Sequence, residues 1–514
     1  MHSLVRIDCG QGGAFLPRKL PIFYSALMLT GVNLLLRFAG TSFQVYLSSR
    51  IGAAGIGLLQ LVLSVGTLAM VAGIGGIRTA TMYLTAEEIG KKKPYNVIWV
   101  LSACFMYSIA FSCTVAALLF HFAPWVAENW IGDSRTVDAL RLFASFLPVT
   151  CLCSVMTGYF TAANRIGTLA AVEVAEQALS MCLTLGALSV WAGNDPCRAC
   201  LCVILGSSLG ACLTLCCLVV LRLRERPPKG ERIPVRHRLI QTALPLAVAD
   251  DLKSGINTVE NLMVPKRLAL NAATASPLAA FGMVSGMVFP VIMFPAAILF
   301  GLTELLIPEL ARCAAAGSKQ RIHYLVKKSL RVALVYGIAF GGLIFLLAEE
   351  LCLWLYKSAE AVNFLKLYSL LIPMLYCDAL TDAMVKGLGQ QKVCVRYNIF
   401  TSALDVLFLY LMLPQYGMSG YYFSFLITHL INFGLSLRRL LKITIKRIPL
   451  YIPILSAASV FFAVWAASFV ASPIMGTICF LLILGSLLFL FRIITFADVR
   501  WVKGLVYKKT SPQR

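Results

Sequence analysis

Long apolar stretches follow one another along this sequence from Pro21 to Arg492, with only short polar breaks between them. A helix needs about 20 apolar residues to cross a hydrocarbon layer about 30 Å thick. Charged residues make up 13% of the chain, whereas an ordinary soluble domain has about 25%. The sequence therefore predicts an all-α polytopic membrane protein and excludes a soluble globular enzyme.

The apolar runs predict about 14 transmembrane helices, which leave only short connections and no room for a soluble domain between them. The expected spans are 22–47, 56–84, 96–123, 139–163, 166–191, 199–221, 239–265, 276–303, 325–347, 362–385, 393–413, 419–437, 450–470 and 474–491.

A strongly basic, Pro-containing connection from Arg222 to Arg238 follows the sixth predicted span. The Gly-rich stretches 54–84 and 279–309 lie in corresponding places before and after it. This arrangement predicts two six-helix lobes in the same orientation around a central cavity, as in many alternating-access carriers. The expected divisions are a cytoplasmic segment at 1–21, an N-lobe at 22–228, a C-lobe at 229–447, and two additional spans with a basic tail at 448–514.

The formal net charge of +22 has a simple cause in a membrane protein, because cytoplasmic loops are rich in Lys and Arg. With the N-terminus inside, the predicted cytoplasmic segments hold 33 of these residues and the opposite side holds six. We therefore expect a multi-pass protein of the cytoplasmic membrane with both termini in the cytoplasm. The phospholipid bilayer is its expected partner, and nucleic acid is not.

Two arginines lie inside predicted spans. Arg37 is in the middle of the first span, and Arg78 is near the cytoplasmic end of the second. An arginine at the bilayer centre costs roughly 2.5 to 3.5 kcal/mol even on a lenient scale, so neither is expected to face lipid. One guanidinium group can donate two parallel hydrogen bonds to a phosphate group. We therefore interpret Arg37 and Arg78 as a cationic site for a phosphate-containing substrate. The alternatives are an internal ion pair for Arg37 and extension of Arg78 to the membrane surface.

Carboxylates inside spans form a second set of candidates. In the seventh span, Asp250 and Lys253 can neutralise each other at i, i+3, which leaves Glu260 as the stronger candidate for substrate binding. Asp378 in the tenth span and Asp405 in the eleventh have no local basic partner. They are candidates for binding a coupling ion, a proton or sodium, or for pairing with cations across the cavity.

The other polar residues favour structural roles. Asp382 and Lys386 have the spacing of a helix pair, and His429 is expected to be a satisfied core residue. The cysteines within 197–202 lack the second ligand pair of a zinc site. The sequence contains no His/Cys/Asp constellation and no phosphate-binding loop ending in Lys-Ser or Lys-Thr. We therefore expect no catalytic residues, no metal and no cofactor.

Several stretches carry a family resemblance: N-L-L-L-R-F-A-G, L-S-S-R-I-G-A-A-G-I-G-L-L-Q, V-P-K-R-L, A-F-G-M-V-S-G-M-V-F-P and L-I-P-E-L-A-R. Over about residues 22 to 445 the chain resembles the stage V sporulation protein B group. That group is a bacterial branch of the multidrug/oligosaccharidyl-lipid/polysaccharide (MOP) exporter superfamily. The resemblance implies two six-helix lobes and two additional spans like those of the lipid II flippase.

In that flippase, arginines on the first two spans engage the lipid pyrophosphate, and Arg37 and Arg78 fall in comparable helices. The stretch G-G-I-R-T-A-T departs from the family's usual small-residue run at the end of the second span. Arg78 is therefore expected to be particular to a subgroup.

These observations favour a flippase that moves a polyprenyl-phosphate-linked oligosaccharide or cell-envelope precursor by alternating access. The first alternative is a cation-coupled exporter of small organic or drug-like molecules, which would place carboxylates and aromatic residues in the N-lobe cavity. A membrane glycosyl- or acyltransferase would need a longer outer loop than any predicted here. A structural role in an envelope complex is the remaining alternative.

The charge asymmetry predicts the topology directly. A single cysteine replacing Gly230, in a background without native thiols, should resist an impermeant thiol reagent applied outside intact cells, because the loop is cytoplasmic. Ready labelling at this position would contradict the topology, and a cysteine in the predicted outer segment near Glu360 serves as the labelled control.

Overall fold

The computed structural model describes residues 22–91, 96–163, 165–192, 195–224, 235–272, 274, 276–315, 317–444, 451–470 and 472–493. Every element within these ranges is helical, which confirms the predicted all-α class. The predicted N-terminal segment, the basic tail beyond Ile493, Gly230 and the expected lobe boundary at 228 lie outside the described residues.

The helices of the N-terminal half are α1 (Ile22–Ile74), α2 (Ile77–Gly90), α3 (Val97–Trp125), α4 (Val137–Ala162), α5 (Ile166–Ala187) and α6 (Pro196–Leu223), with short turns η2 (Val126–Ile131), η3 (Ser134–Thr136) and η4 (Leu188–Ala192). Those of the C-terminal half are α7 (Arg236–Leu268), α8 (Pro277–Gly282), η5 (Met283–Val288), α9 (Phe289–Ala315), α10 (Lys319–Leu346), α11 (Ala348–Tyr356), α12 (Glu360–Ser369), α13 (Ile372–Gly387), α14 (Gln391–Thr444), α15 (Tyr451–Ala467) and α16 (Pro473–Leu490).

Two helices are too long to be single crossings. The 53 residues of α1 would extend about 80 Å if straight, well beyond a hydrocarbon layer of about 30 Å. Non-helical backbone at Gly52 (φ 70°) divides α1, and Gly417 (φ 57°) divides the 54 residues of α14. Both breaks fall in connections that the sequence predicted, between spans 22–47 and 56–84 and between spans 393–413 and 419–437.

The second predicted span differs from the structure. It was expected to run unbroken to residue 84, but Gly75 (φ 51°) and Gly76 (φ 69°) adopt left-handed backbone and begin a new helix, α2. A residue without a Cβ adopts this conformation with little strain. Arg78 therefore lies in the first turn of a separate helix rather than within a continuous span.

Nine segments of the described chain are long and apolar enough to cross a membrane, or ten if the bent pair α12–α13 is one span. The chain is thus a multi-pass membrane protein. The polar α7 and the 17-residue α15 fall outside this set. The number of 14 crossings stays a prediction.

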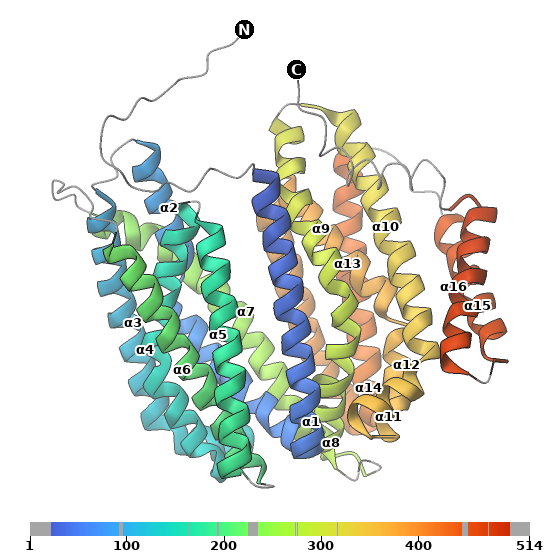
Figure 1. Ribbon diagram of the computed structural model, residues 1–514, viewed down its shortest axis with the longest axis horizontal. Helices are drawn as coiled ribbons and strands as arrows, with labels where there is room; N and C mark the ends of the chain where they lie inside the picture. The colour runs from blue at the N-terminus through green and yellow to red at the C-terminus, as the bar shows by residue number, and fades with distance from the viewer. Residues whose placement is uncertain are drawn as a thin grey trace.

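The helices form two groups side by side (Figure 1). Helices α3 to α6 lie on the left, and α9, α10, α13 and α14 lie on the right, with α1 and α7 between the groups. At the far right, α15 and α16 pack against each other and against α10. The groups contain the helices expected in the two lobes, and we keep the names N-lobe and C-lobe for the predicted ranges.

The lobes meet where α1 crosses α8 and η5, through glycines of both halves. A Cβ at Gly57 would lie 2.4 Å from the Leu278 carbonyl oxygen, and one at Gly282 would lie 2.0 Å from the Ala53 carbonyl oxygen. These glycines belong to the two Gly-rich stretches that marked the halves in the sequence. The glycines of these stretches therefore allow the backbones of the two lobes to pack closely.

Replacing Gly282 with Ala should lower the melting temperature of the purified protein, by an amount equivalent to roughly 1 to 3 kcal/mol, because a backbone carbonyl cannot move aside as a side chain can. The matched control is Gly434→Ala, since a Cβ at Gly434 would meet nothing within 4 Å. Equal melting temperatures for the two variants would contradict the close crossing.

Candidate functional site

A polar cavity of about 550 Å³ lies among α7, α9, α13 and α14 in the C-lobe. Its ionisable lining comes from residues far apart in the sequence. They are Lys253, Glu260, Asp378, Asp382, Lys386, Asp405 and His429. The cavity thus combines four carboxylates with two lysines and one histidine.

The structure brings three of the sequence-predicted site residues together on this cavity. Glu260 comes from α7, Asp378 from α13 and Asp405 from α14. Glu260 and Asp405 thus face one cavity from different helices. Carboxylates gathered on one cavity favour a cation or a proton, because like negative charges repel each other.

Asp405 is 6% exposed and is held by hydroxyl groups of its own long helix. The Ser424 hydroxyl donates to its Oδ1 at 2.5 Å, and the Thr428 hydroxyl donates to the same oxygen at 3.1 Å. These contacts cross the Gly417 break, which folds the two parts of α14 against each other. Neutral donors stabilise the carboxylate without cancelling its charge.

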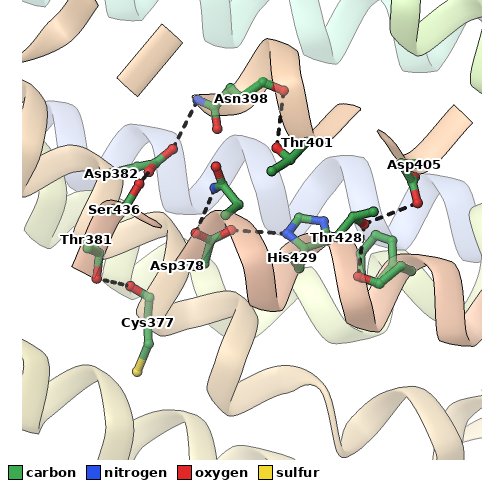
Figure 2. A network of polar contacts seen from close by, with 12 residues as sticks. Cys377, Asp378, Thr381, Asp382, Asn398, Thr401, Asp405, Thr428, His429 and Ser436 are labelled. Atoms are coloured by element: carbon green, nitrogen blue, oxygen red, sulfur yellow. Dashed lines mark hydrogen bonds and ion pairs between the residues drawn. The ribbon is translucent and has the colours of Figure 1, made fainter. Parts of the chain in front are cut away.

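Asp378 is also 6% exposed, and Figure 2 shows its two oxygens engaged by different side chains of α14. Nδ1 of His429 lies 3.1 Å from one carboxylate oxygen, and the Asn432 amide donates to the other at 2.8 Å. The His429 ring also packs on Phe425 at a centroid distance of 4.3 Å. Asp378 therefore has a titratable partner, although the sequence offered no basic residue near it.

The neighbouring Asp382 is held differently from the predicted helix pair. Its carboxylate accepts from the Ser436 hydroxyl at 2.8 Å and from the Asn398 amide at 3.1 Å (Figure 2). No ion pair joins Asp382 to Lys386 in the part of the chain that the structure describes.

The same holds on α7, where Asp250 and Lys253 form no ion pair within the described ranges. Lys253 instead lines the carboxylate cavity. The neutralisation that the i, i+3 spacing permits is therefore not seen as an ion pair among the described residues.

A smaller cavity of about 160 Å³ adjoins the first. Phe300, Thr303, Asp378 and His429 line both cavities, and the rest of the smaller one is mainly apolar. Asp378 and His429 therefore lie in the wall between two cavities.

Arg37 lies midway between the start of α1 and the break at Gly52, and its side chain is exposed. Its guanidinium carbon lies 4.7 Å from the centroid of the Phe300 ring. No carboxylate pairs with Arg37 among the described residues. The structure thus gives this charge an aromatic face as its partner, whereas the sequence suggested an ion pair as the alternative to a ligand site.

Arg78 is exposed in the first turn of α2, and Glu173 on α5 lies within its electrostatic range. The neighbouring Glu176 accepts a hydrogen bond of 2.6 Å from the Thr214 hydroxyl on α6. No contact among the described residues joins Arg78 to Arg37, so the two arginines appear in separate surroundings.

Sequence reasoning missed most of the residues that hold the carboxylates. Ser424, Thr428, Asn432 and Ser436 recur every four residues and form one polar stripe along α14. All four donate to carboxylates of the cavity. This spacing was the available signal. His429, expected to be a satisfied core residue, has Asp378 as its polar partner and also lines the cavity.

The described residues contain no group of three or more His, Cys, Asp or Glu that could hold a metal ion. The thiols of Cys197, Cys200 and Cys202 are free and buried on α6. They pack in the core of the lobe.

Two families match successive parts of the chain. The family described as "Polysaccharide biosynthesis protein" matches residues 23–246, and the family "MatE" matches residues 261–411. Two Bacillus subtilis (strain 168) proteins are similar over much of their length. Stage V sporulation protein B is 22% identical over 414 residues, covering 78% of this chain and 80% of that protein. Sporulation protein YkvU is 22% identical over 314 residues, covering 59% and 68%.

Solved structures share the fold. An inward-facing multidrug resistance MATE family transporter of the MOP superfamily matches with a TM-score of 0.67 at 12% identity, covering 81% of this chain and 98% of that one. The lipid II flippase MurJ in an inward closed conformation also matches with a TM-score of 0.67, at 11% identity, covering 90% and 98%.

The chain therefore has the fold of these solved MATE and MurJ structures, built from helices that are long and apolar enough to cross a membrane. Its sequence is similar to that of stage V sporulation protein B over most of both chains, so the predicted resemblance is confirmed.

Proposed function

We propose that this protein is a flippase that moves a polyprenyl-phosphate-linked oligosaccharide or cell-envelope precursor across the bacterial cytoplasmic membrane by alternating access. It carries out no catalytic step and uses no cofactor. Both termini face the cytoplasm in this proposal, which rests on the distribution of Lys and Arg along the sequence. The observation that carries the proposal is Arg37, a charge deep in a span whose described partner is an aromatic ring.

The geometry of Arg37 supports an anionic ligand. A guanidinium group stacks through its flat face, while its N–H donors point outward along its edge. No hydrogen bond joins Arg37 to another described residue, so its donors are available for phosphate oxygens beside the Phe300 ring. A bound phosphate would also supply the negative charge that the span lacks around Arg37.

Arg78 is the second proposed phosphate ligand. Glu173 supplies a neighbouring negative charge. No ion pair joins the two side chains among the described residues, so the guanidinium of Arg78 is available to a phosphate oxygen.

The carboxylate cavity supports ion coupling by Asp378 and Asp405, with a proton or a sodium ion as the coupling ion. Both groups are buried, and Asp405 accepts only from neutral hydroxyls in the described contacts. Glu260 was predicted to bind substrate. Its place on the same cavity as Asp378 and Asp405 supports a role among the coupling carboxylates instead.

A cation-coupled exporter of small organic molecules remains the second candidate. The four carboxylates in one cavity favour it, because they would attract an organic cation. The position of the carboxylates distinguishes the two candidates. That exporter was expected to carry them in the N-lobe cavity, whereas this cavity lies in the C-lobe.

The substrate proposal predicts that purified protein binds farnesyl pyrophosphate more tightly than farnesol. Arg37→Ala or Arg78→Ala should each weaken pyrophosphate binding by about 10- to 100-fold, since each removes a charge-assisted contact. Arg37→Lys should fall between wild type and Arg37→Ala, because lysine keeps the charge and loses the paired donors. Fluorescence or calorimetric titration in nanodiscs measures these affinities.

The matched control is Arg50→Ala, which removes another exposed arginine of α1 beside the Gly52 break. It should leave the affinity unchanged. Equal affinity for farnesyl pyrophosphate and farnesol, or no loss in the Arg37→Ala/Arg78→Ala double variant, would reject the phosphate site and favour the exporter.

The coupling proposal predicts that Asp378→Asn/Asp405→Asn abolishes the dependence of transport on an ion gradient or membrane potential, because the neutral amides no longer bind and release a cation. Flipping of a fluorescent polyprenyl pyrophosphate in proteoliposomes measures this dependence. Glu349→Gln, at the start of α11 and away from the cavity, is the control. Full gradient dependence in the double variant would assign both aspartates a structural role.

A further inference from the structure

We propose that Phe300 is a positioning residue that links the anion site at Arg37 to the carboxylate cavity of the C-lobe. The inference rests on the proposed function and deepens it, because it names the contact through which the coupling ion and the anionic substrate affect each other.

Phe300 lies near the middle of α9, between the two sites. The Arg37 guanidinium approaches its ring at 4.7 Å, and the same residue lines both the 550 Å³ cavity and the adjoining 160 Å³ cavity. Asp378 and His429 line these two cavities with it. Phe300 therefore both contacts Arg37 and lines the carboxylate cavity.

The contact at 4.7 Å restricts where the Arg37 guanidinium can lie. A long arginine side chain loses much rotamer freedom when it binds a ligand, and an arginine already held by a ring has less freedom to lose. The ring of Phe300 offers no oxygen or nitrogen acceptor to the guanidinium. Phe300 therefore prepares Arg37 for the anion without forming conventional hydrogen bonds to its donors.

The ring also holds the positive charge of Arg37 close to a cavity with four carboxylates. When this cavity holds no cation, its negative potential attracts Arg37 and opposes an approaching phosphate. A bound cation cancels part of that potential, so the anion binds more tightly. By thermodynamic linkage, the anion must raise the affinity for the cation by the same factor. A side chain without a ring face would release Arg37 from this position and remove the linkage.

The experiment measures the affinity of the full-length protein in nanodiscs for farnesyl pyrophosphate. Titrations are run in sodium chloride and in choline chloride, at mildly acidic and mildly basic pH, so that sodium and protons are tested separately. We expect one of these cations to tighten wild-type binding by about 5-fold or more. In Phe300→Leu, the affinity should fall by about 2- to 30-fold and the cation effect should disappear. Phe300→Tyr keeps the ring and should keep both properties.

The matched control is Phe294→Leu. Phe294 is on the same helix, is 41% exposed and contacts Phe38 of α1 at a ring centroid distance of 6.0 Å. It lines neither of the two cavities. Phe294→Leu therefore removes an aromatic contact between α1 and α9. It should leave both the affinity for farnesyl pyrophosphate and the effect of the cation unchanged.

Phe300→Met provides a second variant without a ring, and melting temperatures identify any variant that does not fold. An undiminished cation effect in folded Phe300→Leu or Phe300→Met overturns the inference and leaves the phosphate site standing. Loss of the effect in Phe294→Leu as well would also overturn it, because general α1–α9 packing would then be the cause. Wild-type protein that binds farnesyl pyrophosphate no better than farnesol rejects the proposed function itself, and the inference with it.

Discussion

An ionised side chain in the hydrocarbon layer is tolerated only where protein groups, water or an opposite charge replace the hydration it loses. This constraint explains how the polar cavity of the C-lobe is built. Three aspartates of the C-lobe each accept hydrogen bonds from the polar stripe along α14. Hydroxyl and amide donors stabilise a carboxylate but do not neutralise it. The cavity therefore keeps negative charge that a cation can balance, in addition to what Lys253 and Lys386 supply.

The same constraint applies to helix α7 at the boundary between the lobes, because its polar side chains have partners on both sides. At its start, Arg238 pairs with Glu87 and Glu88 at the end of α2. Further along, the Thr258 hydroxyl and the Asn261 amide donate to the backbone oxygen and the hydroxyl of Ser64 on α1. Glu260, between these two residues, lines the carboxylate cavity instead. One face of α7 thus contacts the N-lobe and the next borders the cavity, so a rotation of this helix would change both sets of contacts.

Features that depend on short-range pattern could be predicted from the sequence, and features that depend on distant partners could not. The breaks at Gly52 and Gly417 and the candidates Glu260, Asp378 and Asp405 were recognisable, because a charge or a glycine between apolar runs is a local signal. Phe300 was not, because an aromatic residue in an apolar run is the normal content of a buried helix and its partner Arg37 lies in the other half of the chain. The helix break at Gly75–Gly76 was not predicted, because apolar residues continue on both sides of it.

The separation of charge between the lobes has a consequence for the direction of transport under the proposed function. Each elementary charge that crosses the membrane gains or loses about 2.3 kcal/mol per 100 mV, and the cytoplasmic side is negative. A pyrophosphate headgroup is therefore driven outward by the potential, while Arg37 and Arg78, once emptied, are drawn back inward. The carboxylates of the C-lobe carry the opposite charge and would resist the inward return if they stayed bare. A cation that binds them from outside removes this resistance, so that both halves of the cycle run in the direction of the membrane potential.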